Sequence, residues 1–121
     1  TENHMSRVDC LHWFVIESNW GNLSNIRLIG WGNGYVKLPK SHPLFGEDYD
    51  VISEKIEWQG NELTYADFDG KYYIVGFDTN HYGMDQYNWS KSRVEKEAER
   101  LSSALFKYWL KSERKIQSIS G

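Results

Sequence analysis

The sequence is short of cysteine and has no long apolar run. Its single cysteine, Cys10, excludes a disulfide within the chain and, on its own, a cysteine-rich zinc site. No apolar run approaches the ~18 residues that a membrane-spanning helix needs. No signal peptide is visible either, so we expect a protein that stays out of membranes and in a reducing cytoplasm.

The sequence also lacks an excess of positive charge. Its formal net charge is -3 at pH 7, which argues against general nucleic-acid binding because such binding needs a basic face. It contains no phosphate-binding loop, no dinucleotide fingerprint and no glycine-flanked serine. The absence of these motifs gives nucleophilic catalysis little support, and the sequence indicates no cofactor.

Aromatic residues, in contrast, are abundant. Phe, Trp and Tyr make up 16% of the 121 residues. A small core does not easily bury so many rings, so we expect some of them to face a groove or a partner. The shares of hydrophobic residues (40%) and charged residues (26%) are typical of a globular protein. Residues 1–5 look like a cloning remnant, which leaves residues 6–121 as a single domain.

Six segments have the β-branched, aromatic or alternating pattern of strands. They are residues 11–17, 26–31, 35–38, 52–58, 62–68 and 71–77. Glycines at positions 32 and 34 predict a tight hairpin turn, and Asp69-Gly70 predicts another before the last segment. We expect Leu63 and Tyr65, together with Ala66 or Phe68, to face the core. The last segment is apolar on both faces, which predicts a central strand.

One long helix is predicted after Ser92. Ser92 and Glu95 have the spacing of a capping box at its start. Apolar residues then recur at three- and four-residue intervals, which predicts a core-facing stripe. The stripe consists of Val94, Ala98, Leu101, Leu105, Tyr108 and Trp109. The expected fold is therefore α+β: a mostly antiparallel β-sheet of about five or six strands with one long C-terminal helix packed on it.

The last predicted strand leads into a polar loop, which is the first candidate site. Asp78, Asn80, His81 and Tyr82 follow the strand, and functional residues often lie on loops held by a rigid scaffold. Asp78 and His81, with His42, could ligate a metal such as zinc and leave one position open for water, as in a small metal-dependent hydrolase. The alternative is that Asp78 caps the turn, His81 bonds to the backbone and His42 orders its own loop.

A second interpretation is a platform of rings beside the same loop. Rings that surround a few convergent polar groups suit a nucleobase or another planar ligand. The candidate rings are Trp58, Tyr72, Tyr82, Tyr87 and Trp89. The alternative is that Tyr87 and Trp89 only fix the loop to the start of the helix.

A third interpretation is a protein-binding surface in the middle of the chain. Acidic residues alternate there with the rings of Phe45 and Tyr49. The acidic residues are Glu47, Asp48, Asp50, Glu54 and Glu57. Such a mixture can occupy a basic, nucleic-acid-binding surface on a partner. The alternative is an ordinary solvated face.

Two segments resemble signatures of a known family. Residues 34–50 (GYVKLPKSHPLFGEDYD) and 76–83 (GFDTNHYG), followed by a tryptophan and a helix, are similar to small uncharacterised proteins of tailed phages and prophages. The family's His-Gly-Gly-Leu-Thr stretch is replaced here by residues 59–64 (QGNELT), without the histidine, and Met84 intervenes before Asp85. A metal or catalytic site of the family would therefore be incomplete in this chain.

The resemblance implies a phage-encoded accessory protein that acts by binding in the cytoplasm of the infected bacterium. We predict a counter-defence role, either as an anti-CRISPR or related inhibitor of a host immune effector, or by sequestering a signalling nucleotide. The partner is then a host defence protein or a small nucleotide-like ligand. A homodimer remains open, and the small metal-dependent hydrolase stays the alternative.

Overall fold

The computed structural model describes residues 11–18, 30–59, 62–79 and 88–120, with only the backbone described in 114–120. The elements in chain order are β1 (Trp13–Glu17), β2 (Gly32–Leu38), α2 (Tyr49–Lys55), β3 (Tyr65–Phe68), β4 (Tyr73–Phe77) and α3 (Lys91–Ser120). The strand predicted over residues 26–31 lies mostly outside the described part of the chain.

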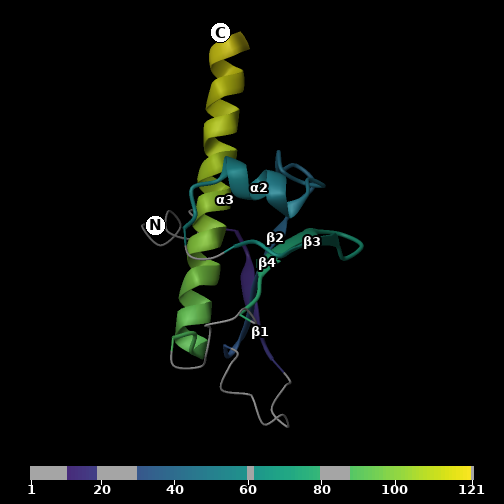
Figure 1. The fold of residues 1–121 in the computed structure, drawn as a ribbon. Helices are drawn as coiled ribbons and strands as arrows, with labels where there is room; N and C mark the ends of the chain where they lie inside the picture. Colours follow the sequence, from purple (N-terminus) through teal and green to yellow (C-terminus); the bar gives the residue numbers. More distant parts are fainter. Residues whose placement is uncertain (1–10, 19–29, 60–61, 80–87, 121) are drawn as a thin grey trace, which may run out of the picture.

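The strands form one antiparallel sheet in the order β1-β2-β4-β3 (Figure 1). Strand β4 pairs with β2 on one side, where Val75 lies opposite Val36, and with β3 on the other side. All five residues of β4 are buried, which confirms the prediction of a central strand. Within the described residues the sheet has four strands, fewer than the five or six predicted.

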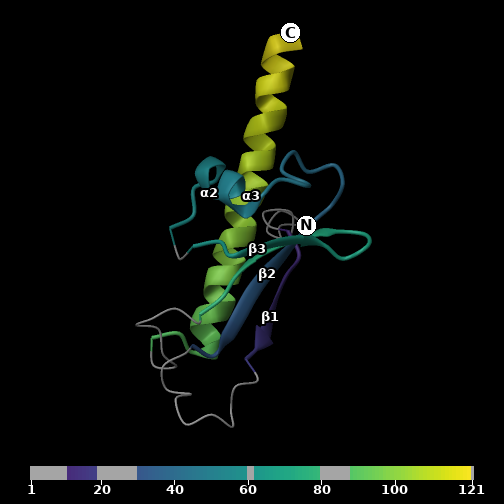
Figure 2. The same cartoon turned by 45° about the vertical axis from the view of Figure 1, so that its right-hand side comes forward.

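Helix α3 lies across one face of the sheet (Figure 2). Every second residue of β2 is buried, so Val36 and Leu38 point to the covered face. The residues of the predicted helical stripe that are fully buried are Val94, Ala98, Leu101 and Leu105. Removal of these apolar surfaces from water holds the helix on the sheet. The predicted α+β fold with one long C-terminal helix is therefore confirmed.

The glycines predicted to form a hairpin turn lie inside strand β2. A Cβ on Gly32 would lie 2.2 Å from the carbonyl oxygen of Ile16, and a Cβ on Gly34 would lie 2.6 Å from the ring of Phe77. Neither glycine has a positive φ. The predicted turn is therefore wrong, because these glycines allow a neighbouring strand and a core ring to approach closely.

Helix α2 stands where a strand was predicted over residues 52–58. Ile52 and Ile56 are four residues apart and both buried, which is the spacing of a helix face. Asp50 in the first turn and Lys55 in the last turn match the helix dipole. The prediction was wrong because a helix of seven residues shows only one repeat of its apolar period.

The turn predicted at Asp69-Gly70 is confirmed. Gly70 has a φ of 103°, a conformation that glycine adopts without steric cost. The carboxylate of Asp69 accepts hydrogen bonds from the backbone N–H groups of Lys71 at 2.9 Å and of Tyr72 at 2.7 Å. This turn fixes the pairing of β3 with β4.

The predicted start of the long helix is displaced by two residues. Helix α3 begins at Lys91, and the hydroxyl of Ser90 accepts a hydrogen bond from the backbone N–H of Arg93 at 3.4 Å. Ser90 therefore occupies the capping position. The capping box predicted on Ser92 and Glu95 is wrong, because Ser92 already lies in the first turn of the helix.

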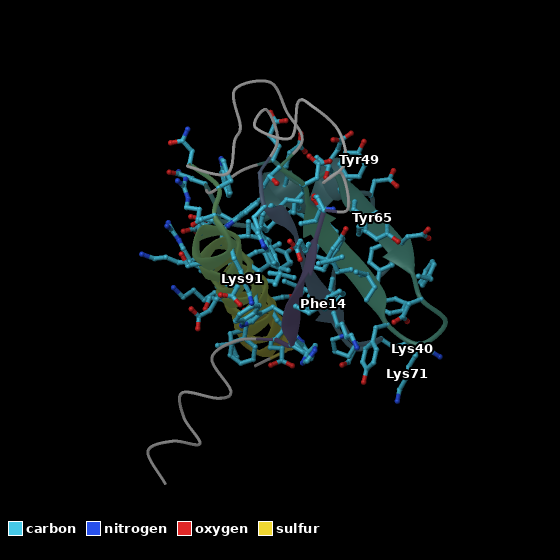
Figure 3. The ribbon with its side chains drawn as sticks, turned by 90° about the horizontal axis from the view of Figure 1, so that it is seen from below. Phe14, Lys40, Tyr49, Tyr65, Lys71 and Lys91 are labelled. Carbon is cyan, nitrogen blue, oxygen red and sulfur yellow. The ribbon has the colours of Figure 1, made fainter. Side chains whose placement is uncertain are left out.

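The sheet face opposite α3 carries a row of rings. Phe14 stacks on Tyr35 with ring centroids 5.2 Å apart, and Tyr35 meets Tyr65 edge-on at 5.7 Å. Gly76 lies between the two tyrosines in the register, and a Cβ there would lie 2.4 Å from the Tyr35 ring. Tyr65 is 42% exposed and lies across the sheet from Lys91 of α3 (Figure 3). The prediction that Tyr65 faces the core is therefore wrong.

Candidate binding surface

The polar loop after β4 is described at its first two residues. Asp78 is half-buried and takes part in interactions within the fold. Thr79 is fully buried, and its hydroxyl donates a hydrogen bond to the carbonyl oxygen of Gly32 at 2.7 Å. Its own carbonyl oxygen accepts the N–H of Gly30 at 2.7 Å. The residues of the predicted site that lie outside the described part of the chain are Asn80, His81 and Tyr82.

Trp89 is an anchor at the start of α3. Its buried ring packs on Phe77, with ring centroids 6.2 Å apart, and lies under the guanidinium group of Arg93 at 4.3 Å. Its carbonyl oxygen accepts the backbone N–H of Trp31 at 2.8 Å. These contacts fix the start of α3 to the sheet and leave little of the Trp89 ring for a ligand.

The described members of the predicted ring platform are spread along β4. Trp58 packs on Phe77, with ring centroids 5.4 Å apart. Phe77 is also the ring that Trp89 contacts. Tyr72 lies before the other end of β4, where its ring faces the ammonium group of Lys37 at 5.4 Å. The platform members outside the described residues are Tyr82 and Tyr87.

His42 joins the loop after β2 to helix α3. Its imidazole is 2% exposed, and its Nδ1 accepts the backbone N–H of Leu44 at 3.0 Å. Its Nε2 donates to the carbonyl oxygen of Leu105 at 3.0 Å. Burial lowers the pKa of His42 below its usual value, and the hydrogen bond to Leu105 opposes this shift in part. The imidazole is therefore neutral near pH 7.

This arrangement leaves His42 without a ring nitrogen for a metal. A neutral imidazole binds a metal through its lone pair, and that lone pair is already held by the N–H of Leu44. In the residues that the structure describes, no group of three acid, histidine or cysteine side chains could hold a metal ion. The contacts of His42 match the alternative that it orders its own loop.

The acidic segment and the end of β3 together form the best-supported candidate surface. Asp48 and Asp50 flank Tyr49 at the start of α2, and all three side chains are exposed. Asp67 and Phe68 join them from β3 and are also exposed. We call the following residues the acidic surface: Glu47, Asp48, Tyr49, Asp50, Asp67 and Phe68.

Tyr73 of β4 joins the acidic surface to the sheet. Its hydroxyl donates a hydrogen bond to the backbone carbonyl oxygen of Glu47. Burial raises the pKa of Tyr73, and the carboxylates of Asp48, Asp67 and Glu47 raise it further, because they disfavour another negative charge. Carboxylates from two separate segments therefore contribute to the electrostatic environment of one phenol.

Aromatic rings support the acidic surface and also extend from it. Phe45 and Phe68 pack on Tyr73, with ring centroids 5.6 and 4.9 Å away, and lie 5.3 Å from each other. Phe68 is nevertheless 58% exposed and Tyr49 is 41% exposed. Two large rings therefore face solvent among the carboxylates.

The contribution of β3 to this surface was missed in the sequence. The sequence pattern predicts only a strand at Asp67 and Phe68, without a role in binding. The register places Phe68 directly opposite Tyr73 and so brings Asp67 close to the 45–50 segment. The signal was the Asp69-Gly70 turn, since a tight hairpin turn sets which residues of its two strands face each other.

Comparison of the chain with protein-family models, with curated proteins and with solved structures finds no match. Neither helix in the described part of the chain has the length and apolar character needed to cross a membrane. The acidic surface is therefore interpreted from its own chemistry and from the resemblance of the two sequence segments.

Proposed function

We propose that the protein is a phage-encoded inhibitor that acts by binding, with the acidic surface as its contact region. Its partner is a host immune effector, such as a CRISPR effector, whose basic surface otherwise binds nucleic acid. The protein covers that surface and so excludes the nucleic acid, without a chemical step. The phage context comes from the resemblance of residues 34–50 and 76–83 to phage signatures.

The observation that carries the proposal is the assembly of carboxylates around exposed rings. Asp48 and Asp67 come from different segments, which the ring contact between Phe45 and Phe68 at 5.3 Å brings together. Negative charge steers a basic partner toward the surface and speeds the encounter. An exposed ring such as Phe68 supplies the apolar contact that dominates most interfaces. A nucleic-acid strand likewise combines negative charge with planar rings.

The support beneath the surface favours a preformed contact region. His42 ties the loop to α3, and Tyr73 ties the backbone of Glu47 to the sheet. Groups that are ordered before binding lose less conformational entropy when the partner arrives. The carboxylates can therefore meet a basic partner without rearrangement of the loop.

Charge reversal at Asp48 and Asp67 tests this proposal. Both side chains are exposed, so we expect Asp48→Lys/Asp67→Lys to fold normally. It should bind the effector about 100-fold more weakly, because two positive charges then face a basic surface. The effector is captured from a lysate of the bacterial host with the wild-type protein. A competition assay then measures how much protein displaces nucleic acid from the captured effector.

The matched control reverses two carboxylates outside the acidic surface. Glu17 on β1 and Glu113 on α3 are exposed, and Glu17→Lys/Glu113→Lys changes the net charge by the same amount. We expect this control to stay within about threefold of the wild type, because distant exposed charges are screened by salt. Equal losses in both double variants would contradict a specific surface, and so would full inhibition by Asp48→Lys/Asp67→Lys.

A further inference from the structure

A groove separate from the acidic surface opens between helix α3 and the segment that leaves α2. Its volume is about 720 Å³, which falls within the ~300–1,000 Å³ typical of small-molecule sites. Lys55, the last residue of α2, contributes to one side, and Arg100, Lys107 and Lys111 contribute from α3. We call this region the basic groove, and Figure 2 shows α2 beside α3 at this level.

The basic groove differs in charge from the chain as a whole. Four cationic side chains and two carboxylates, Glu57 and Glu99, line it, which is an excess of two positive charges. The whole chain has a net charge of -3. Lys111 pairs with Glu57 at 2.8 Å, so part of the positive charge is already balanced. The groove is still a local region that attracts anions.

Lys55 and Lys107 are the cations best placed for a ligand. Neither forms a salt bridge with a side chain that the structure describes, and both are exposed. Arg100 contacts Glu97 at 3.4 Å through one terminal nitrogen, and a guanidinium group has further N–H donors. Separate ammonium and guanidinium donors around a hollow suit the oxygens of a phosphate group.

The lining between these charges is aromatic and apolar. Trp58 and Tyr108 are half-buried and pack against the core, and Ile56 and Ala104 are buried in the same lining. The Trp58 ring is held against Phe77, with ring centroids 5.4 Å apart. Rings that are fixed before a ligand arrives suit a nucleobase, because stacking on them needs little further ordering.

We propose that the basic groove binds a nucleotide, with its base against Trp58 and Tyr108 and its phosphate oxygens held by Lys55, Lys107 and Arg100. A bare anion would not use the rings, and an apolar ligand would leave the cations unpaired. The combination favours a ligand that is both planar and phosphorylated. This gives the chain a second binding function, for a small molecule, at a site distinct from the acidic surface.

Isothermal titration calorimetry tests the proposal with ATP, GTP and cyclic di-AMP as probes. Adenosine, guanosine and inorganic phosphate represent the separate parts of these ligands. We expect saturable binding of at least one nucleotide, about tenfold or more tighter than its parts, because linked contacts reinforce each other. Higher salt should weaken it, since the lysines are exposed. No binding of any nucleotide, or equal binding of inorganic phosphate, overturns the proposal.

Variants of the lining locate the ligand. Lys55→Ala/Lys107→Ala should bind the nucleotide about tenfold more weakly, because it loses two charge-assisted contacts. Lys96→Ala, which changes an exposed lysine of α3 outside the groove, should bind it as the wild type does. Glu57→Gln removes a carboxylate from the lining and should raise the affinity about twofold. Equal affinity of the double lysine variant and the wild type would show that the groove is not the site.

The two proposals can fail separately. Asp48→Lys/Asp67→Lys changes the acidic surface only, so we expect it to bind the nucleotide probe with unchanged affinity. The double lysine variant should in turn still block the captured effector. Loss of both activities in either variant would contradict the assignment of two independent sites.

Discussion

The two ends of helix α2 carry opposite charge. At its start, Asp48 and Asp50 belong to the acidic surface, and at its end Lys55 lines the basic groove. The helix has seven residues, a length of about 10 Å, so the two regions lie close together. A net charge of -3 therefore conceals two local fields of opposite sign, and in our proposals each field attracts a different kind of ligand.

The two regions also differ in how they present their rings. The acidic surface exposes Phe68 and Tyr49 to solvent, whereas the rings of Trp58 and Tyr108 in the basic groove are half-buried. Exposed rings suit a broad contact with another macromolecule, and a hollow suits a small molecule. The high aromatic content of the chain therefore serves two different kinds of binding in our proposals.

The largest expected effect is the loss of stability in His42→Ala. This variant removes the hydrogen bonds that join the loop beneath the acidic surface to α3. The variant leaves the N–H of Leu44 and the carbonyl oxygen of Leu105 without their side-chain partner and opens a cavity beside Trp109. We expect the free energy of unfolding to fall by about 3 kcal/mol. Urea unfolding followed by tryptophan fluorescence measures this change.

The control for this variant is His12→Ala, the same substitution at an exposed histidine. We expect it to change the free energy of unfolding by less than about 0.5 kcal/mol. Similar stabilities of the two variants would mean that the link between the loop and α3 contributes nothing. That result would also remove the argument that the acidic surface is preformed.

A smaller loss of stability is expected from Tyr73→Phe, which changes the acidic surface and leaves the basic groove intact. The variant keeps the ring contacts with Phe45 and Phe68 but loses the hydrogen bond to Glu47. We expect about 1 kcal/mol of destabilisation, weaker blocking of the effector and unchanged nucleotide binding. Tyr65→Phe is the control on the open sheet face. If Tyr73→Phe weakened nucleotide binding as much as it weakens blocking of the effector, the two regions would not be separate.

The smallest expected effect is a pH dependence that comes from His42. Its native pKa lies below the usual value of 6.5 because of burial, so as the pH falls the unfolded chain binds this proton first. As the pH falls, the free energy of unfolding decreases wherever the unfolded state binds more protons than the native state. The loss should therefore begin near pH 6.5 and end once the pH passes below the lowered native pKa.

Urea unfolding between about pH 8 and pH 5 checks this window. The wild type should lose more stability on acidification than His42→Gln, which has no group to protonate at this position. Parallel pH profiles of the two proteins would contradict the assignment to His42.

The sequence predicted best those elements whose pattern is long or purely local. The stripe of α3 repeats over several turns, and Asp69-Gly70 needs only its own turn chemistry. The glycines of β2 failed as turn predictors because their role depends on Phe77, a distant ring. Helix α2 failed because Ile52 and Ile56 are too few to show a period.

The candidate sites follow the same logic. Asp48 and Asp50 are visible in the sequence because they lie beside aromatic residues in one segment. Asp67 belongs to the surface only through the register of β3 and β4. The basic groove was not predicted, because Lys55 and Lys107 lie far apart in the chain and only the packing of α3 brings them to one hollow.

Gly76 has a consequence for how the edge strand finds its alignment. Strand β3 has four residues, so few backbone hydrogen bonds distinguish the correct pairing from a shifted one. Tyr65 can reach Tyr35 only across a position of β4 without a side chain, and a slip of one residue would turn Tyr65 to the other face. The missing side chain therefore favours this one alignment of β3, and with it the place where Asp67 joins the acidic surface.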